Sequence, residues 1–117
     1  MEHILIVEDD VNINQLLKEA LEKEGYLCTQ AFSGTEALLA AEHKKFSLML
    51  LDLMLPGMPG EEVLGHLREI SDMPVIILTA KDTLNSKVDM LLSGADDYVT
   101  KPFDIKEVTA RIVAALR

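Results

Sequence analysis

Short apolar runs alternate along this chain with segments in which apolar residues recur every three or four positions. Continuous short runs are typical of β-strands, and the wider spacing is typical of amphipathic helices. The strand-like runs cover residues 4–7, 27–31, 48–51, 75–78 and 97–100, and a helical segment follows each of them. The pattern therefore predicts a succession of strand–helix units, (βα)5.

Polar residues and glycines indicate where some of the predicted helices begin and end. Ser33 and Asp104 each stand three positions before a glutamate, the spacing of a capping box, so a helix should begin directly after each. Gly25 and Gly94 should end the first and fourth helices. The first and last helices should each bury one apolar face, formed by Ile13, Leu16, Leu17, Ala20 and Leu21 and by Ile105, Val108, Ile112, Ala115 and Leu116.

The composition of the strands predicts their order in a parallel sheet. The first, third and fourth runs are continuously apolar, as expected of strands that are buried on both faces, whereas the second and fifth carry polar residues and should lie at the edges. With right-handed crossovers, the consistent order is 2-1-3-4-5. This is an α/β, doubly wound, flavodoxin-like fold with helices on both faces of a five-stranded sheet and a ligand crevice between the first and third strands.

Composition and charge narrow the class of protein. The 117 residues, 49% of them hydrophobic, are enough for one domain with a single sizeable core, so we expect one domain over residues 1–117. The formal net charge of −9 argues against direct binding to nucleic-acid phosphates or to an anionic membrane. The single cysteine, Cys28, excludes an internal disulfide, and the amino terminus lacks a secretory signal. Both features favour a cytoplasmic location. No apolar stretch approaches the roughly 20 residues needed to cross a bilayer.

Acidic side chains follow two of the predicted central strands. Glu8 and Asp9 come directly after the first strand, and Asp52 comes directly after the third. The carboxyl ends of neighbouring parallel strands meet at one edge of the sheet, where these carboxylates repel one another unless a divalent cation is bound. The sequence therefore predicts a metal site with a spare carboxylate nucleophile.

The strand ends carry groups of residues that resemble the receiver domain of bacterial two-component response regulators, in the CheY-like superfamily. The groups are residues 4–10 (ILIVEDD), residues 51–57 (LDLMLPG) with Gly60, residues 78–80 (LTA) and residues 94–103 (GADDYVTKPF). The resemblance covers essentially the whole chain. A single group would be weak support, but all of them in register at the strand ends are specific.

The resemblance implies a role for each matching residue. Asp52 would be the phosphoacceptor, attacking a phosphohistidine on a sensor histidine kinase and becoming an aspartyl phosphate. Mg²⁺ would be held by Glu8, Asp9, Asp52 and the backbone carbonyl of Met54. Thr79 would donate a hydrogen bond to the phosphoryl group, and the ammonium of Lys101 would neutralise its oxygens. The resemblance also implies a cis peptide bond between Lys101 and Pro102.

The same resemblance implies a conformational switch. Movement of Thr79 toward the phosphoryl group would vacate space that Tyr98 could enter, changing the surface formed by the fourth helix, the fifth strand and the fifth helix. That surface is typical of the OmpR/PhoB winged-helix subfamily, in which phosphorylation favours a symmetric homodimer. DNA would then be bound only by a C-terminal effector domain that is absent from this chain. The alternative is that the chain is a complete single-domain regulator. The expected interface residues are Lys87, Asp96, Asp97, Glu107 and Arg111.

Plainer interpretations exist for most of these residues. The acids after the first strand could cap the first helix, as Asp10 or Asn12 is expected to do. Thr79 alone is an ordinary β-branched strand end, and Tyr98 alone is an ordinary edge-strand aromatic. Lys101 alone is an ordinary solvated lysine. The charged surface of the fourth helix, fifth strand and fifth helix could be an ordinary solvated surface, because exposed ion pairs contribute little free energy. The groups taken together favour the functional interpretation.

Two rival functions stay open at this point. A Mg²⁺-dependent phosphohydrolase of similar chemistry has a second aspartate two positions after its nucleophile, where this chain has Met54. A receiver that only binds partners would lack a key acid or the lysine. In this chain each of these key positions carries a suitable residue, and the sole departure is Glu8, where aspartate is commoner. We therefore expect no enzyme acting on outside substrates, but a switch that catalyses only its own phosphoryl transfer. Its autodephosphorylation should be slow because Met54 cannot position the attacking water by hydrogen bonding.

Overall fold

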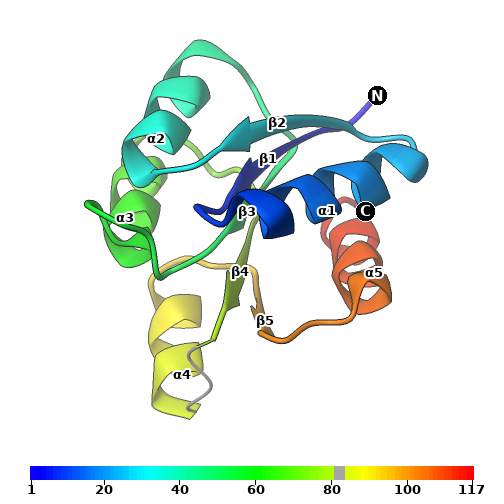
Figure 1. The fold of residues 1–117 in the computed structure, drawn as a ribbon. Helices are drawn as coiled ribbons and strands as arrows, with labels where there is room; N and C mark the ends of the chain where they lie inside the picture. Colours follow the sequence, from blue (N-terminus) through cyan, green and yellow to red (C-terminus); the bar gives the residue numbers. More distant parts are fainter. Residues whose placement is uncertain (81–83) are drawn as a thin grey trace.

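The computed structural model describes residues 1–80 and 84–117 and shows a parallel sheet between two layers of helices (Figure 1). The strand order is β2-β1-β3-β4-β5, which confirms the predicted topology. Each strand is followed by a helix along the chain. The elements are β1 (His3–Val7), α1 (Val11–Lys23), β2 (Leu27–Ala31), α2 (Gly34–His43), β3 (Leu48–Leu51), α3 (Gly60–Ile70), β4 (Val75–Thr79), α4 (Leu84–Leu92), β5 (Asp97–Thr100) and α5 (Ile105–Ala115).

The central strands separate two apolar cores. Because successive side chains of a strand point to opposite faces, Ile4 and Ile6 of β1 pack on one side of the sheet, and Leu5 and Val7 pack on the other. The first side is covered by α1 and α5, and the second by α2, α3 and α4 (Figure 1). Burial on both faces explains why these strands are continuously apolar.

Most of the predicted boundaries are confirmed. The Ser33 hydroxyl accepts a hydrogen bond from the Glu36 N–H at the start of α2, and the Asp104 carboxylate caps α5 through the Lys106 N–H. Asp10 caps α1 by accepting from the N–H groups of Asn12 and Ile13. The fourth strand is one residue longer than expected and ends at Thr79.

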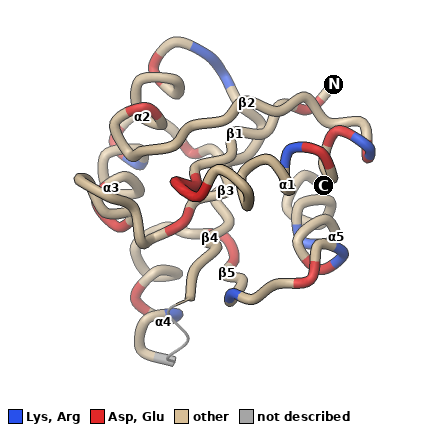
Figure 2. The backbone as a smooth tube through the Cα atoms, in the orientation of Figure 1, with Lys and Arg blue, Asp and Glu red and all other residues tan. Residues whose placement is uncertain are grey.

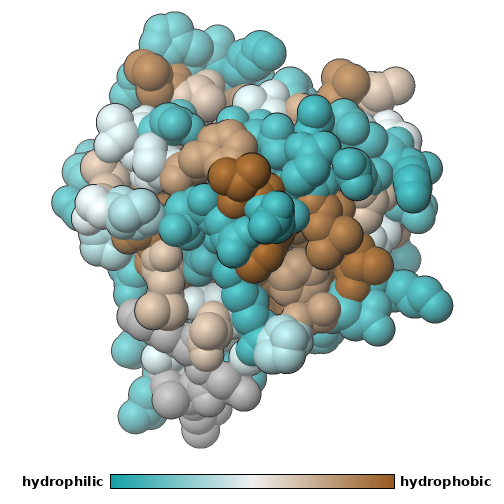
Figure 3. Space-filling view, viewed as in Figure 1, coloured by the Kyte–Doolittle hydropathy of each residue, from teal (hydrophilic) through white to brown (hydrophobic). Residues whose placement is uncertain are grey.

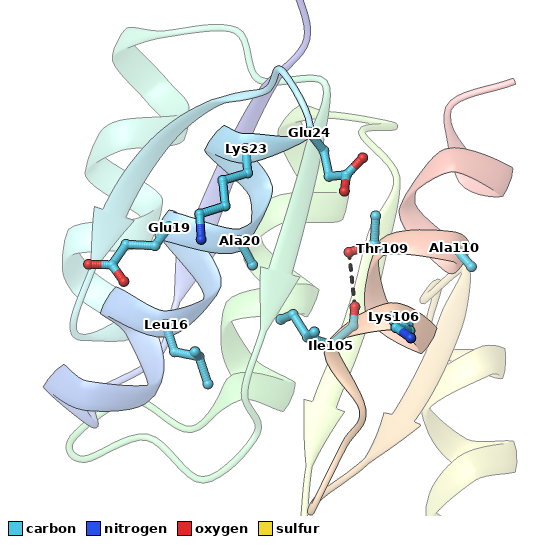
Figure 4. A pocket seen from close by; sticks show the side chains of 9 residues that line it. All are labelled: Leu16, Glu19, Ala20, Lys23, Glu24, Ile105, Lys106, Thr109 and Ala110. Atoms are coloured by element: carbon cyan, nitrogen blue, oxygen red, sulfur yellow. Dashed lines mark hydrogen bonds between the residues drawn. The ribbon is translucent and has the colours of Figure 1, made fainter.

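The predicted buried face of α1 was partly wrong. Leu16 is 53% exposed, whereas Asn14 is completely buried together with Leu17 and Leu21. Leu16 is exposed because α1 and α5 leave a groove of about 600 Å³ between them, which Leu16 lines opposite Ile105 (Figure 4). Apolar side chains gather on this part of the surface (Figure 3).

Within residues 1–80 and 84–117, no helix combines the length and the apolar composition that crossing a bilayer requires.

Candidate metal centre

The carboxyl ends of β1 and β3 bring three acidic side chains together. Val7 and Leu51 are register partners, so the residues that follow them leave the sheet side by side. One carboxylate oxygen from each of Glu8, Asp9 and Asp52 lies within 4.8 Å of the others. Figure 2 shows acidic segments where these strands end. The clustering that the sequence predicts is therefore present.

The acids differ in their exposure. Glu8 and Asp52 are 2% and 4% exposed, whereas Asp9 is exposed. Asp9 also lines an open cleft of about 620 Å³, together with Met54 and other residues of the loop between β3 and α3. An ion or a phosphodonor can therefore approach the carboxylates from the Asp9 side.

Lys101 reaches these carboxylates from the residue that follows β5. Its ammonium donates to Glu8 Oε1 at 2.5 Å and to Asp52 Oδ2 at 2.8 Å. The peptide bond between Lys101 and Pro102 is cis, as the family resemblance implies. One positive charge thus lies between two buried negative charges.

Burial and charge perturb the titration of this cluster. Burial raises the pKa of Glu8 to about 6, and although hydrogen bonds from Lys101 and the Asp10 N–H oppose this effect, the charge of Asp52 adds to it. Burial alone would lower the pKa of Lys101, but its hydrogen bonds to Asp52 and Glu8 outweigh burial and raise that pKa. The cluster therefore keeps its lysine charged and favours additional positive charge.

The loop after β3 holds the Asp52 side chain from the opposite side. Asp52 Oδ1 accepts a hydrogen bond from the Met54 N–H at 3.0 Å. The Met54 side chain itself is 58% exposed. The start of α3 packs closely under this loop, since a Cβ on Gly60 would lie only 2.5 Å from the Asp52 carbonyl oxygen. Both oxygens of the Asp52 carboxylate are thus oriented by contacts within the protein.

Thr79 and Tyr98 lie on neighbouring strands of the same half of the sheet. Thr79 ends β4, is fully buried, and accepts a hydrogen bond from the Lys101 N–H through its main-chain oxygen at 2.8 Å. Tyr98 on β5 is buried, at 9% exposure, and the Lys87 ammonium lies 5.9 Å from the centre of its ring. The end of β4 and the residue after β5 thus bring Thr79 and Lys101 to the sheet edge where Asp52 lies.

The charged residues expected at a dimer interface make contacts within their own chain. Arg111 donates to Asp97 at 3.0 Å and to Glu107 at 3.1 Å, and these hydrogen bonds raise the pKa of Arg111. Asp96 pairs with Arg68 of α3 at 3.2 Å. Arg68 also donates to the main-chain oxygens of Gly94 and Met73, which ties the α4–β5 turn to α3. The sequence reasoning did not single out Arg68.

Asn14 is a second residue that the sequence reasoning missed. Its amide donates to the main-chain oxygens of Glu8 at 2.9 Å and of Ala31 at 3.1 Å. A signal was available, because Asn14 is a polar residue at the helical spacing of the buried Leu17 and Leu21.

The donor set fits a magnesium ion. It consists of carboxylate oxygens, the ligands that Mg²⁺ prefers, and one of them is exposed, as suits an ion that keeps several of its waters. No thiolate or imidazole takes part in the cluster, so the set does not favour zinc.

Comparison with known proteins gives a consistent result. The sequence pattern of the family described as "Response regulator receiver domain" matches residues 4–113. YkoG of Bacillus subtilis (strain 168), described as an uncharacterized transcriptional regulatory protein, is 56% identical over 116 residues, which is 98% of this chain and 51% of YkoG. The chain thus spans about half the length of this curated relative.

Two solved structures are close in fold. The receiver domain of the Francisella response regulator 1452 has a TM-score of 0.95 and 37% identity, covering 99% of this chain and 97% of that one. The response regulator TrrA from Thermotoga maritima, solved in complex with Mg(2+)-BeF, has a TM-score of 0.89 and 38% identity, covering 99% of this chain and all of its own (100%).

Proposed function

The chain belongs to the response regulator receiver domain family, and from that premise we propose that it is a phosphorylation-activated switch whose phosphoacceptor is Asp52. The observation that carries this proposal is the position of the Asp52 carboxylate, which is buried, bonded to Lys101 and clustered with Glu8 and Asp9. The phosphodonor is a phosphohistidine on a sensor histidine kinase. The switch acts in the cytoplasm, where the kinase domain and the transcription machinery lie.

For the transfer step, the protein mainly has to position the attacking carboxylate and to stabilise the charge on the phosphoryl oxygens. An Asp52 oxygen forms a bond to phosphorus, the phosphorus–nitrogen bond breaks, and the imidazole nitrogen leaves with the electron pair. The Met54 N–H and the Lys101 ammonium hold the attacking carboxylate in one orientation. As the phosphoryl group arrives, the ammonium transfers its contact from the carboxylates to the phosphoryl oxygens and stabilises their charge.

Glu8, Asp9, Asp52 and the backbone carbonyl of Met54 would hold Mg²⁺ at this site. When bound, the ion supplies positive charge to the phosphoryl oxygens in the transition state. The likeness to TrrA, solved with Mg(2+)-BeF, supports this assignment. Glu8, whose pKa is raised, must be ionised to take part, which makes binding dependent on pH.

The phosphorylated state should be long-lived. Hydrolysis requires a water molecule oriented in line with the phosphorus–oxygen bond. Met54, two positions after Asp52, is exposed, and its side chain offers no strong hydrogen-bonding group to such a water. We therefore propose slow autodephosphorylation as the one further reaction of the domain.

Phosphorylation controls the face formed by α4, β5 and α5. In the proposed switch, Thr79 turns its hydroxyl toward the phosphoryl group and Tyr98 repacks into the vacated space. The phosphorylated chains then form a symmetric homodimer in which Lys87, Asp96, Asp97, Glu107 and Arg111 contribute to the interface. Arg111 already pairs with Asp97 and Glu107, so dimerisation would extend an existing network rather than pair isolated charges.

The output of the switch is transcription regulation. Its support is the similarity to YkoG, described as a transcriptional regulatory protein, of which this chain matches about half. DNA contact would be made by a separate effector domain, because the receiver itself carries a formal net charge of −9.

Intact mass spectrometry tests the proposal. Incubation with Mg²⁺ and acetyl phosphate should add the mass of one phosphoryl group to the protein, and the Asp52→Asn variant should stay unmodified. A phosphohydrolase would instead turn over acetyl phosphate steadily without accumulating the adduct. A receiver that only binds partners would do neither, and either of these results would overturn the proposal.

A further inference from the structure

We propose that Asn14 of α1 is a positioning residue for the metal centre, holding the loop between β1 and α1 in the shape that presents Glu8 and Asp9 to Mg²⁺. This inference rests on the proposed function, and it concerns a residue that contacts none of the reacting atoms.

Asn14 joins three segments of the chain. It is completely buried, and its side-chain nitrogen donates to the carbonyl oxygens of Glu8 at 2.9 Å and of Ala31 at 3.1 Å. The Glu8 N–H also donates to the Ala31 oxygen at 3.1 Å. The amide thus fastens the end of β1, the end of β2 and the first turn of α1 at the point where the acidic loop leaves the sheet.

The orientation of this amide follows from its partners. Both contacts are carbonyl oxygens, which only accept hydrogen bonds, so the nitrogen and not the oxygen of Asn14 must face them. The remaining side-chain atom, Asn14 Oδ1, is buried and finds no hydrogen-bond partner among the residues that the structure describes.

That unpartnered oxygen argues against a purely structural role. A buried acceptor without a partner destabilises the folded state, and leucine, whose side chain branches at the same atom, would avoid this cost beside Leu17 and Leu21. Packing of α1 therefore does not explain why an amide side chain stands at position 14. Its hydrogen bonds to the two carbonyl oxygens do explain it.

Asn14 affects the metal site through the peptide unit that joins Glu8 to Asp9. The main-chain carbonyl oxygen of Glu8 lies in the same rigid plane as the N–H and Cα of Asp9. The hydrogen bond that holds this oxygen therefore also fixes the position of the Asp9 Cα, from which the Asp9 side chain extends. Within the described part of the chain, the Asp9 carboxylate itself takes part in no hydrogen bond or ion pair. Its direction toward a bound ion is thus set by its backbone, and that backbone is held by Asn14.

The Asn14→Leu variant separates positioning from stability. It keeps the branched shape of the side chain and removes both donors. The melting temperature should fall by no more than in the Leu21→Ala control, while the dissociation constant for Mg²⁺, measured by isothermal titration calorimetry, rises about tenfold, the lower range for partners that orient metal ligands. Asn14→Ala should show the same rise, and it replaces Asn14→Leu if the latter does not fold.

Leu21→Ala is the matched control. Leu21 is equally buried on the same helix, about two turns from Asn14, so its truncation should lower the melting temperature while the Mg²⁺ dissociation constant stays within about twofold. Wild-type affinity in a folded Asn14 variant, or an equal loss in Leu21→Ala, would overturn the inference. If wild-type protein binds no Mg²⁺, the proposed function falls together with the inference; if it binds Mg²⁺ and is phosphorylated, only the role of Asn14 is at stake.

Discussion

The Lys101 ammonium lies 2.8 Å from the Asp52 carboxylate, although 49 positions separate the two residues in the sequence. This contact joins the nucleophile proposed for phosphoryl transfer to the cation proposed to neutralise the transferred group. It also places the same ammonium between Asp52 and Glu8. One internal cation therefore offsets only part of the negative charge of the three clustered carboxylates.

Removing the ammonium should destabilise the metal-free protein. Lys101→Met leaves Glu8 and Asp52 buried without a counter-charge, which should lower the free energy of unfolding by about 3 kcal/mol in urea titrations. Mg²⁺ should restore more stability to this variant than to wild type, because it replaces the missing charge. Lys106→Met, which removes an exposed lysine of α5, is the control and should change neither value. Equal stability of Lys101→Met and wild type would show that the ion pair is unimportant.

The raised pKa of Glu8 predicts how stability depends on pH without metal. Since that pKa is about 6 in the folded protein and 4.5 is its ordinary value, the folded chain keeps this proton where the unfolded chain has lost it. The stabilising contribution is complete below pH 4.5 and is lost as the pH rises through 6. Relative to Glu8→Gln, wild type should lose about 2 kcal/mol of unfolding free energy between pH 4 and pH 7. Parallel profiles for the two proteins would contradict the burial effect.

The side chain at position 54 should set the lifetime of the phosphorylated state. Met54→Asn introduces a group that can hold the attacking water, so dephosphorylation should accelerate roughly tenfold, equivalent to about 1.4 kcal/mol of barrier. Met54→Leu keeps an apolar side chain and should decay like wild type. Both rates follow from the loss of the phosphoryl adduct in intact mass spectra over time. A fast decay of the wild-type adduct would refute the explanation given for Met54.

The charged network on α5 and β5 predicts how dimerisation responds to mutation. Arg111→Glu places a negative charge beside Asp97 and Glu107, so the phosphorylated variant should stay monomeric in size-exclusion chromatography with light scattering, while phosphorylated wild type forms a dimer. Lys45→Glu reverses an exposed charge in the loop after α2 and serves as the control. If Arg111→Glu dimerises like wild type, this face is not the interface.

The sequence predicted the sheet order because burial on both faces requires continuously apolar strands, and β1, β3 and β4 have them. It also predicted the acidic cluster, since parallel strands that lie side by side end at the same edge. Helix starts followed from Ser33 and Asp104, whose side chains cap locally. These features depend on local patterns or on one rule of topology.

Other features depend on contacts that no local pattern encodes. Periodicity placed Leu16 in the core because it is apolar, but its burial depends on how far α1 lies from α5. Asn14 is buried because two main-chain oxygens need a donor, a demand that arises only after folding. Asp96 was expected to face a second chain, yet it also pairs with Arg68, 28 positions away.

Chemical trapping of the phosphorylated product identifies the residue that accepts the phosphoryl group, which we propose is Asp52. After incubation with Mg²⁺ and acetyl phosphate, borohydride reduction converts an aspartyl phosphate to homoserine, which peptide mass spectrometry locates in the sequence. We expect conversion at position 52, dependent on Mg²⁺ and much reduced in Lys101→Met. Trapping at another residue, or no conversion at position 52 in wild-type protein, would contradict it.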